Sequence, residues 1–156
     1  MSLQTDMVFF RAMKESRELS EMVGEQIFNT AIPGTDSDVD NVEVPYIVVT
    51  YDGMNNEDAT KDDPYEGDTD IVNIGVEIAA KSREELADIA DAVRRAVSSF
   101  CQNYDYEEDD DGIADEIPEG FTLSAQAVQY DPWKPCFWQV LSWRCETKRI
   151  EYNEQD

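Results

Sequence analysis

The chain has 156 residues, and 36 acidic residues against 12 lysine or arginine residues give it a formal net charge of −24 at pH 7. A surface this negative repels phosphate, which argues against direct binding of nucleic acid or of an anionic membrane surface. The sequence contains no histidine, which excludes imidazole-based nucleophile pairs and histidine-ligated zinc.

We expect a single α+β domain over residues 1–156, with a polar tail at about 151–156, because a chain of this length supports one hydrophobic core. No run near 18 apolar residues is present, and the first six residues lack the basic and apolar parts of a signal peptide. We therefore expect neither a membrane span nor a leader. The three cysteines have no CxxC spacing, which is typical of reduced thiols in an intracellular protein.

The first third of the chain predicts one helix, one short extended segment and one strand. Apolar residues recur at helical spacing over residues 5–23, where Thr5 or Asp6 can cap the helix and Gly24 can end it. Residues 25–32 predict the short extended segment. The β-branched and aromatic residues of 44–51 predict the strand, with Pro45 at its start or on a sheet edge. A polar connection from Asp52 to Asp68 follows; if the flanking strands pair, it is an unusually long hairpin loop.

The region from 70 to 100 predicts the centre of the fold. Alternating apolar residues over 70–80 are typical of a strand with one buried face. Ser82 stands three residues before Glu85, the spacing of a capping box at a helix start. The helix that follows carries one apolar stripe and an exposed Asp91–Arg95 pair. A strand followed by an amphipathic helix is typical of a two-layer α+β domain.

The last third predicts two more strands, separated by a break. Residues 102–120 include five consecutive acids, 107–111, and 121–130 alternate as a strand does. Two prolines around Trp133 interrupt the pattern. Residues 136–147 then predict a strand with apolar residues on both faces, which suits a strand covered on both sides or one at a subunit contact. The expected fold is a mostly antiparallel sheet of four to five strands, packed on one face by two α-helices, with long acidic loops.

The sequence offers one weak metal candidate and no catalytic motif. Calcium-loop spacing places possible ligands at Glu107, Asp109, Asp111 and Asp115. The pattern fails at its twelfth position, where Pro118 stands in place of a bidentate glutamate. Nucleotide-binding, hydrolase and metalloprotease motifs are missing as well. We therefore expect a protein that is not an enzyme and that needs no cofactor.

The order of the predicted segments resembles one family. A helix ending in Val23-Gly24 is followed by Gln26-Ile27-Phe28 and Pro33-Gly34, and then by a strand that opens Val44-Pro45-Tyr46-Ile47-Val48-Val49. A later strand runs directly into an alanine-rich amphipathic helix over 87–97. In this order, over roughly residues 5–100, the chain resembles the tail-completion or tail-terminator proteins of long-tailed bacteriophages and prophages.

That resemblance implies a structural virion assembly protein with a small α+β fold and no active site. It implies a ring, typically a hexamer, that caps the finished tail tube and joins it to the head-side connector. The implied partners are copies of the chain itself, the tail-tube protein and a head–tail connector protein. The implied location is the host bacterial cytoplasm during assembly and afterwards the virion tail. The long acidic loops at 53–69 and 102–119 depart from the usual pattern.

Two sets of residues are candidates for contacts in such an assembly. On the last strand, large apolar side chains are candidates for the core or for an interface: Phe137, Trp138, Leu141 and Trp143. In the first acidic loop, charged side chains are candidates to face the channel or a neighbouring ring: Asp58, Asp62, Asp63, Glu66 and Asp68.

A second hypothesis is an acidic binding module, such as a DNA-mimic inhibitor that occupies the basic cleft of a nucleic-acid-binding protein. It explains the charge equally well. It predicts a monomer or dimer with acids spaced along one face as phosphates are, whereas here the acids concentrate in loops.

Overall fold

The computed structural model describes residues 3–30, 42–56, 67, 69–109 and 112–148, and only these are discussed below. They form helices α1 (Thr5–Lys14), α2 (Arg17–Val23), α3 (Arg83–Asn103) and the short 3-10 helix η2 (Ala114–Glu116). The strands are β1 (Ile27–Asn29), β2 (Tyr46–Asn56), β3 (Thr69–Ala80), β4 (Gly120–Ala125), β5 (Gln129–Asp131) and β6 (Cys136–Lys148). In the part described, no helix combines the length and apolarity that crossing a membrane requires.

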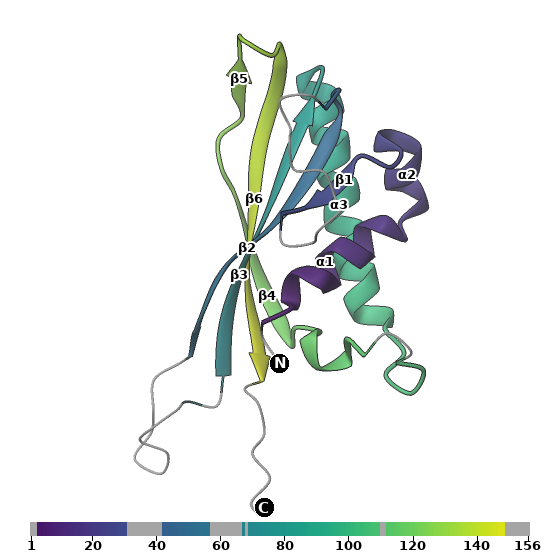
Figure 1. Ribbon diagram of the computed structural model, residues 1–156, viewed down its shortest axis with the longest axis vertical. Coiled ribbons are helices and arrows are strands. Elements are labelled where there is room, and N and C mark those ends of the chain that lie inside the picture. Colours follow the sequence, from purple (N-terminus) through teal and green to yellow (C-terminus); the bar gives the residue numbers. More distant parts are fainter. Residues whose placement is uncertain (1–2, 31–41, 57–66, 68, 110–111, 149–156) are drawn as a thin grey trace, which may run out of the picture.

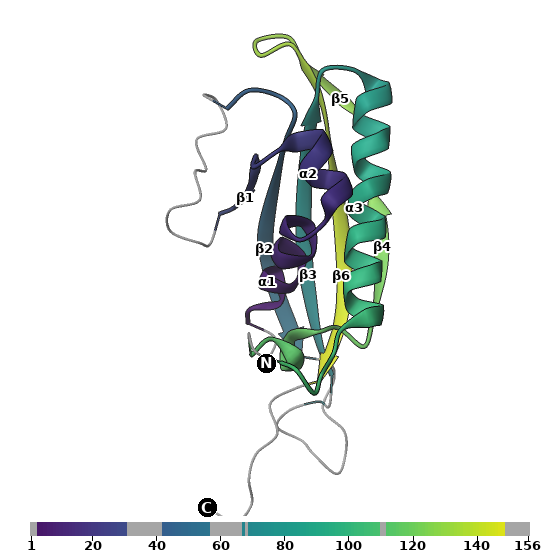
Figure 2. The same ribbon diagram turned by 90° about the vertical axis from the view of Figure 1, so that its right-hand side faces the viewer.

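The strands form one sheet in the order β1-β2-β3-β6-β4, and β5 pairs with the first residues of β6. Among the described residues, β1 and β2 run parallel and the other pairs are antiparallel. The helices cover one face of this sheet (Figures 1 and 2). The expected α+β class is confirmed, with six strands rather than four to five and three α-helices rather than two.

The two longest strands, β3 and β6, lie side by side at the middle of the sheet. Their paired residues run from Thr69–Lys148 to Ala80–Phe137 without interruption. The predicted core face of β3 is confirmed, because its even-numbered apolar residues Val72, Ile74, Val76 and Ile78 all belong to the core beneath the helices. The expectation that only one face of this strand is buried is wrong, since Ile71, Gly75 and Ala79 on the other face are buried too. The apolar stripe of α3 lies on the other side of the same core.

The first predicted helix is two helices, with the break at Ser16. The Ser16 hydroxyl accepts a hydrogen bond from the Leu19 amide at 3.2 Å and so caps α2. A serine side chain can satisfy a helix-start amide in this way and begin a new helix inside an otherwise periodic pattern. Neither Thr5 nor Asp6 caps α1, whose N-cap is Gln4; both side chains are buried. Gly24 ends α2 with a positive φ of 61°, as expected.

Strand β2 is longer than its sequence pattern indicates. It continues through Asp52 to Asn56, and a register shift between Tyr51 and Gly53 marks a bulge. A bulge inserts an extra residue and interrupts the alternation, so the polar residues beyond it do not look like a strand. The sequence left open whether the two strands around the acidic connection pair, and the structure pairs β2 with β3 as an antiparallel hairpin.

The N-terminus of α3 is capped as expected, since the Ser82 hydroxyl accepts from the Glu85 amide at 3.1 Å. The Glu85 carboxylate in turn accepts from the Lys81 amide at 3.0 Å. On the exposed side, Arg95 forms its ion pair with Glu18 of α2 instead of with Asp91. This contact joins two helices that lie far apart in the sequence, so spacing along one helix gives no sign of it.

Candidate interaction site

The most exposed large apolar side chain of the described residues is Trp133, at the tip of the β5–β6 hairpin. Its side chain is 94% exposed. Figure 1 shows this hairpin reaching the upper end of the molecule, beyond the helices. A tryptophan side chain is large and amphipathic, and one left almost wholly in water is available for contact with another molecule.

The tip is held in one conformation by its own side chains. The Asp131 carboxylate accepts hydrogen bonds from the backbone amides of Trp133 at 2.9 Å and Lys134 at 3.4 Å. Pro132 and Pro135 restrict the backbone on either side. The Lys134 ammonium lies 4.9 Å from the centre of the Tyr46 ring, a cation–π contact that ties the tip to β2. The turn that carries Trp133 is therefore stabilised by hydrogen bonds to Asp131 and by the contact of Lys134 with Tyr46.

A second apolar cluster lies at the base of this hairpin, on the sheet face away from the helices. Its buried members are Tyr46, Val48, Ala79 and Cys136, and Trp138 packs against it half-buried. Glu77 occupies the same face, paired in register with Val48 and Val140. Burial raises the pKa of the Glu77 carboxyl. Glu77 therefore lies beside this apolar cluster, and together with Asp131 it raises the pKa of the Cys136 thiol, after the larger effect of burial.

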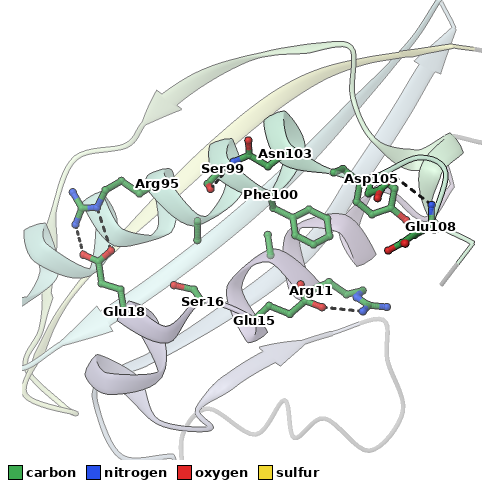
Figure 3. Close-up of a pocket in the computed structure, with 13 residues that line it drawn as sticks. Arg11, Glu15, Ser16, Glu18, Arg95, Ser99, Phe100, Asn103, Asp105 and Glu108 are labelled. Carbon is green, nitrogen blue, oxygen red and sulfur yellow. Dashed lines mark hydrogen bonds and ion pairs between the residues drawn. The ribbon is translucent and has the colours of Figure 1, made fainter. Parts of the chain in front are cut away.

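A groove lies on the opposite side of the molecule, between α1, α2 and α3 (Figure 3). Its volume is about 590 Å³, and Ala12, Ala96 and the half-buried Phe100 give it an apolar floor. Two arginines and four acids line it as well, so acids outnumber cations. The acids are Glu15, Glu18, Asp105 and Glu108.

Both arginines of the groove form ion pairs with groove glutamates. Arg11 contacts Glu15 at 2.9 Å, and Arg95 contacts Glu18 from α3 to α2 (Figure 3). The hydrogen bond from Arg95 lowers the pKa of Glu18, and the same contact raises the pKa of Arg95. Within the described residues Glu108 forms no such pair, so an uncompensated negative charge remains at that end of the groove.

Of the calcium candidates, Asp109 uses its carboxylate for hydrogen bonds within its own loop. The Asp109 carboxylate accepts hydrogen bonds from the amides of Ile113 and Ala114 and from the Tyr104 hydroxyl. The tyrosine bond is the main reason that the pKa of Asp109 is lowered. Glu107 and Asp115 are exposed, and Asp111 lies outside the described residues. The described part of the chain holds no group of three acids or cysteines placed to bind a metal.

The interface candidates on β6 divide between the two faces of the sheet. Leu141 and Trp143 belong to the core beneath the helices, which supports the core alternative for both. Phe137 packs against the same core, half-buried, and Trp138 lies on the opposite face. The acidic loop candidates Asp58, Asp62, Asp63, Glu66 and Asp68 lie outside the described residues.

The sequence pattern did not single out two features of this surface. Trp133 appears in the sequence only as an aromatic between two prolines, and nothing local shows that a turn exposes it. The groove forms from helices about 80 residues apart in the chain, and only their packing brings them together. The two prolines around Trp133 are a sequence sign of a turn there, and no sequence pattern indicates the groove.

The comparisons with known proteins give no family. No family model matches the chain, and no curated protein matches it. Among solved structures, a chain from the virion of a native gene transfer agent particle is 14% identical, with a TM-score of 0.48. The alignment covers 92% of this chain and 94% of that one. At this identity and TM-score the likeness assigns neither a family nor a function.

Proposed function

We propose that this protein is a structural subunit of a phage-like virion, a ring-forming tail terminator that caps the tail tube and joins it to the head-side connector. The observation that carries the proposal is the braced, fully exposed Trp133 at the end of a hairpin. A side chain of this kind serves protein contacts, and tryptophan is enriched among the residues that dominate such contacts.

The remaining support comes from the order of segments and from charge. The segments that resemble the tail-terminator family fold here into one sheet backed by helices. A ring through which DNA passes must not hold phosphate, and a chain of net charge −24 repels it. The acidic loop between β2 and β3 would face the channel or a neighbouring ring.

The test is to disrupt the gene in the phage or prophage genome that carries it and to examine particles by electron microscopy. Loss of a tail terminator should give tails of irregular length and heads without attached tails, and supplying the intact gene should restore joined particles. Normal joined particles without the gene would overturn the proposal.

Two variants then test the acidic loop. One deletes residues 58–66, and the other keeps the length of the loop and replaces its acids by amides. Both retain Asn56, whose side-chain amide donates to Gly67 at 3.1 Å and to Asp70 at 2.8 Å and so closes the base of the loop. If charge is what matters, both variants should join heads poorly. If length is what matters, only the deletion should.

The DNA-mimic alternative makes a different prediction. The purified protein would then bind a basic nucleic-acid-binding protein tightly at low salt, and virions lacking it would be normal. Recovery of a nuclease or repressor in place of tail proteins would favour that alternative.

A further inference from the structure

We propose that two copies of this chain pair edge to edge through β4, as antiparallel strands related by a two-fold axis at Leu123. The occupant of the open sheet edge is then the same strand of a second copy. The inference goes beyond the proposed function, because a two-fold contact joins copies in pairs whether or not they also form a ring.

β4 is an open end of the sheet. Within the described residues it pairs with β6 alone, and Figure 2 shows it at the right-hand margin of the molecule, beyond α3. Just after the strand, the Gln126 amide donates to the Val140 carbonyl at 2.9 Å, in continuation of the same register. In an antiparallel pair every second residue bonds to the neighbouring strand. The backbone groups of Phe121, Leu123 and Ala125 therefore point away from β6.

This edge lacks the features that usually prevent strands from pairing. Proteins protect an open edge by shortening it or by placing charges, prolines or bulges on it. At the other end of the sheet, β1 has only three residues. β4 has six residues without a proline or a charged side chain, and its register with β6 runs without a shift from Gly120 to Ala125. It therefore remains able to accept another strand.

Charge normally keeps two copies of this chain apart, and it is missing at this edge. The net charge is −24, so most of the surface of one copy repels another. Residues 120–130 contain no acidic or basic side chain, and this run of 11 residues is the longest uncharged run in the sequence. On β6, Arg144 and Glu146 lie in register with Thr122 and Gly120 and form an ion pair at 3.8 Å. Two copies can therefore approach here with little repulsion.

The sequence of β4 is complementary to itself about Leu123. With the two-fold axis there, Leu123 lies opposite the same residue of the second copy, Phe121 opposite Ala125, and Thr122 opposite Ser124. Opposite residues share a face of the sheet, so large side chains meet small ones on the helical side, where Phe121 and Leu123 lie. Threonine and serine are a favourable cross-strand pair. The outward backbone groups then form about six hydrogen bonds between the copies.

Pairing also covers apolar surface and ends the association at two copies. Phe121 and Leu123 pack against the core but stay half-buried at the end of the sheet. A second β4 would cover part of what remains exposed. Of the described strands, only the two short β1 strands would then lie at the ends of the joined sheet.

The first test places charges at Thr122 and Ser124, which are exposed. Thr122→Glu together with Ser124→Glu sets acids opposite each other across the contact. This pair of substitutions should weaken dimerisation about tenfold or more, measured by analytical ultracentrifugation. Thr122→Lys together with Ser124→Glu sets a lysine opposite each acid, so it should leave dimerisation at least as strong as in the wild type.

The matched control adds two acids at exposed positions on the helices, Ser20→Glu together with Ala87→Glu. Its net charge equals that of the variant with two acids on β4, yet it should weaken dimerisation much less. Equal weakening by the two variants would overturn the inference, because general repulsion would then explain both. Dimerisation of the lysine–glutamate variant as weak as that of the variant with two acids would overturn the proposed register. Circular dichroism checks that each variant keeps the wild-type fold.

Amide hydrogen exchange tests the contact residue by residue. The amides of Thr122 and Ser124 point towards β6 and should be protected at every protein concentration. The amides of Phe121, Leu123 and Ala125 should exchange quickly in the monomer and slowly once dimers form. Fast exchange of these three amides in a wild type that has dimerised would overturn the inference.

A wild type that stays monomeric up to about 1 mM would also overturn it. Protection of the three outward amides only after addition of purified tail-tube protein would assign the edge to a strand of that protein instead of a second copy. The particle experiment decides the proposed function separately, because it does not depend on whether the purified chain dimerises.

Discussion

The side-chain amide of Asn29 donates a hydrogen bond of 2.9 Å to the Asp6 carboxylate, and both residues are buried. Asp6 lies in the first turn of α1 and Asn29 at the end of β1, so this bond fixes the first helix against the edge of the sheet. Asp70 and Glu116 are buried near the same end of the fold, and with Asp6 they contribute to raising the pKa of Tyr51, after the larger effect of its burial.

Replacing Asn29 by alanine should destabilise the protein by about 1–3 kcal/mol, because the buried Asp6 carboxylate loses a donor. Urea unfolding followed by circular dichroism measures the change. Asn103→Ala is the matched control, since Asn103 donates a similar bond to Ser99 at the exposed end of α3. Its effect should stay within about 0.5 kcal/mol. Equal effects at the two sites would show that burial of the Asp6–Asn29 pair is unimportant.

Gly75 gives a second prediction, because a side chain there would have to displace two side chains of β2. A Cβ at this position would lie 2.5 Å from Oδ2 of Asp52 and 2.6 Å from the Thr50 hydroxyl. Gly75→Ala should therefore cost about 1–3 kcal/mol. Gly120→Ala on β4 is the control, since a Cβ added there would meet nothing within 4 Å.

The cause of the Gly75 effect is tested in a background that carries Thr50→Ala and Asp52→Ala. Most of the cost of Gly75→Ala should disappear there, because the two atoms that crowd the new methyl group are gone. An undiminished cost would place the strain in the backbone of β3.

The raised pKa of Glu77 predicts that replacing this residue by glutamine stabilises the protein by an amount that depends on pH. Burial raises the pKa of this carboxyl above its ordinary value of 4.5, so the folded protein holds the proton more readily than the unfolded chain does. The stability that protonation contributes is therefore present at low pH and lost as the pH rises through the raised pKa. Glu77→Gln should melt at a higher temperature than the wild type at about pH 8, and the difference should shrink towards pH 5.

Melting curves of both proteins across that range provide the measurement for Glu77. Glu25→Gln, at an exposed position, controls for the loss of one negative charge. A difference for Glu77→Gln that does not change with pH would mean that titration of this carboxyl is not its cause.

Substitution by alanine should strongly destabilise the fold at Trp143 and hardly change its stability at Trp133. Trp143 is 2% exposed, and its ring meets that of Phe9 edge to face at 5.3 Å. Trp143→Ala should destabilise the fold by about 3–5 kcal/mol. Trp133→Ala should change the free energy of unfolding by less than about 0.5 kcal/mol, because its side chain contacts mainly water. Chemical denaturation of both variants tests the pair.

The three thiols should react slowly in the folded protein. Burial raises the pKa of Cys101 to about 11 and that of Cys145 to about 12, and it raises that of Cys136 as well. Because the thiolate is the reactive form, a disulfide reagent at pH 8 should modify the native protein far more slowly than the protein in guanidinium. Rapid modification of one thiol without denaturant would show that its site opens in solution.

Local pattern was enough to predict the centre of the fold. The alternation of β3 and the stripe and cap of α3 follow from periods of two and about 3.6, which a single segment displays by itself. The α+β class follows from the order of such segments, whereas the pairing of β2 with β3 as a hairpin is decided by the structure. Local pattern failed at two places. It missed the end of α1 and start of α2, because the Ser16 hydroxyl caps a new helix inside a periodic segment. It also missed the second half of β2, because a bulge inserts a residue and interrupts the alternation.

The sequence by itself therefore determined the charge, the α+β class and the strand and helix at the core. Tertiary structure alone decided which aromatic side chains are buried and which are exposed to solvent. Trp143 and Trp133 are ten residues apart in similarly aromatic surroundings, yet one fills the core and the other stands in water. The reason is that burial depends on what the opposite layer supplies: α1 brings Phe9 to Trp143, and no element of the described chain covers the tip that carries Trp133.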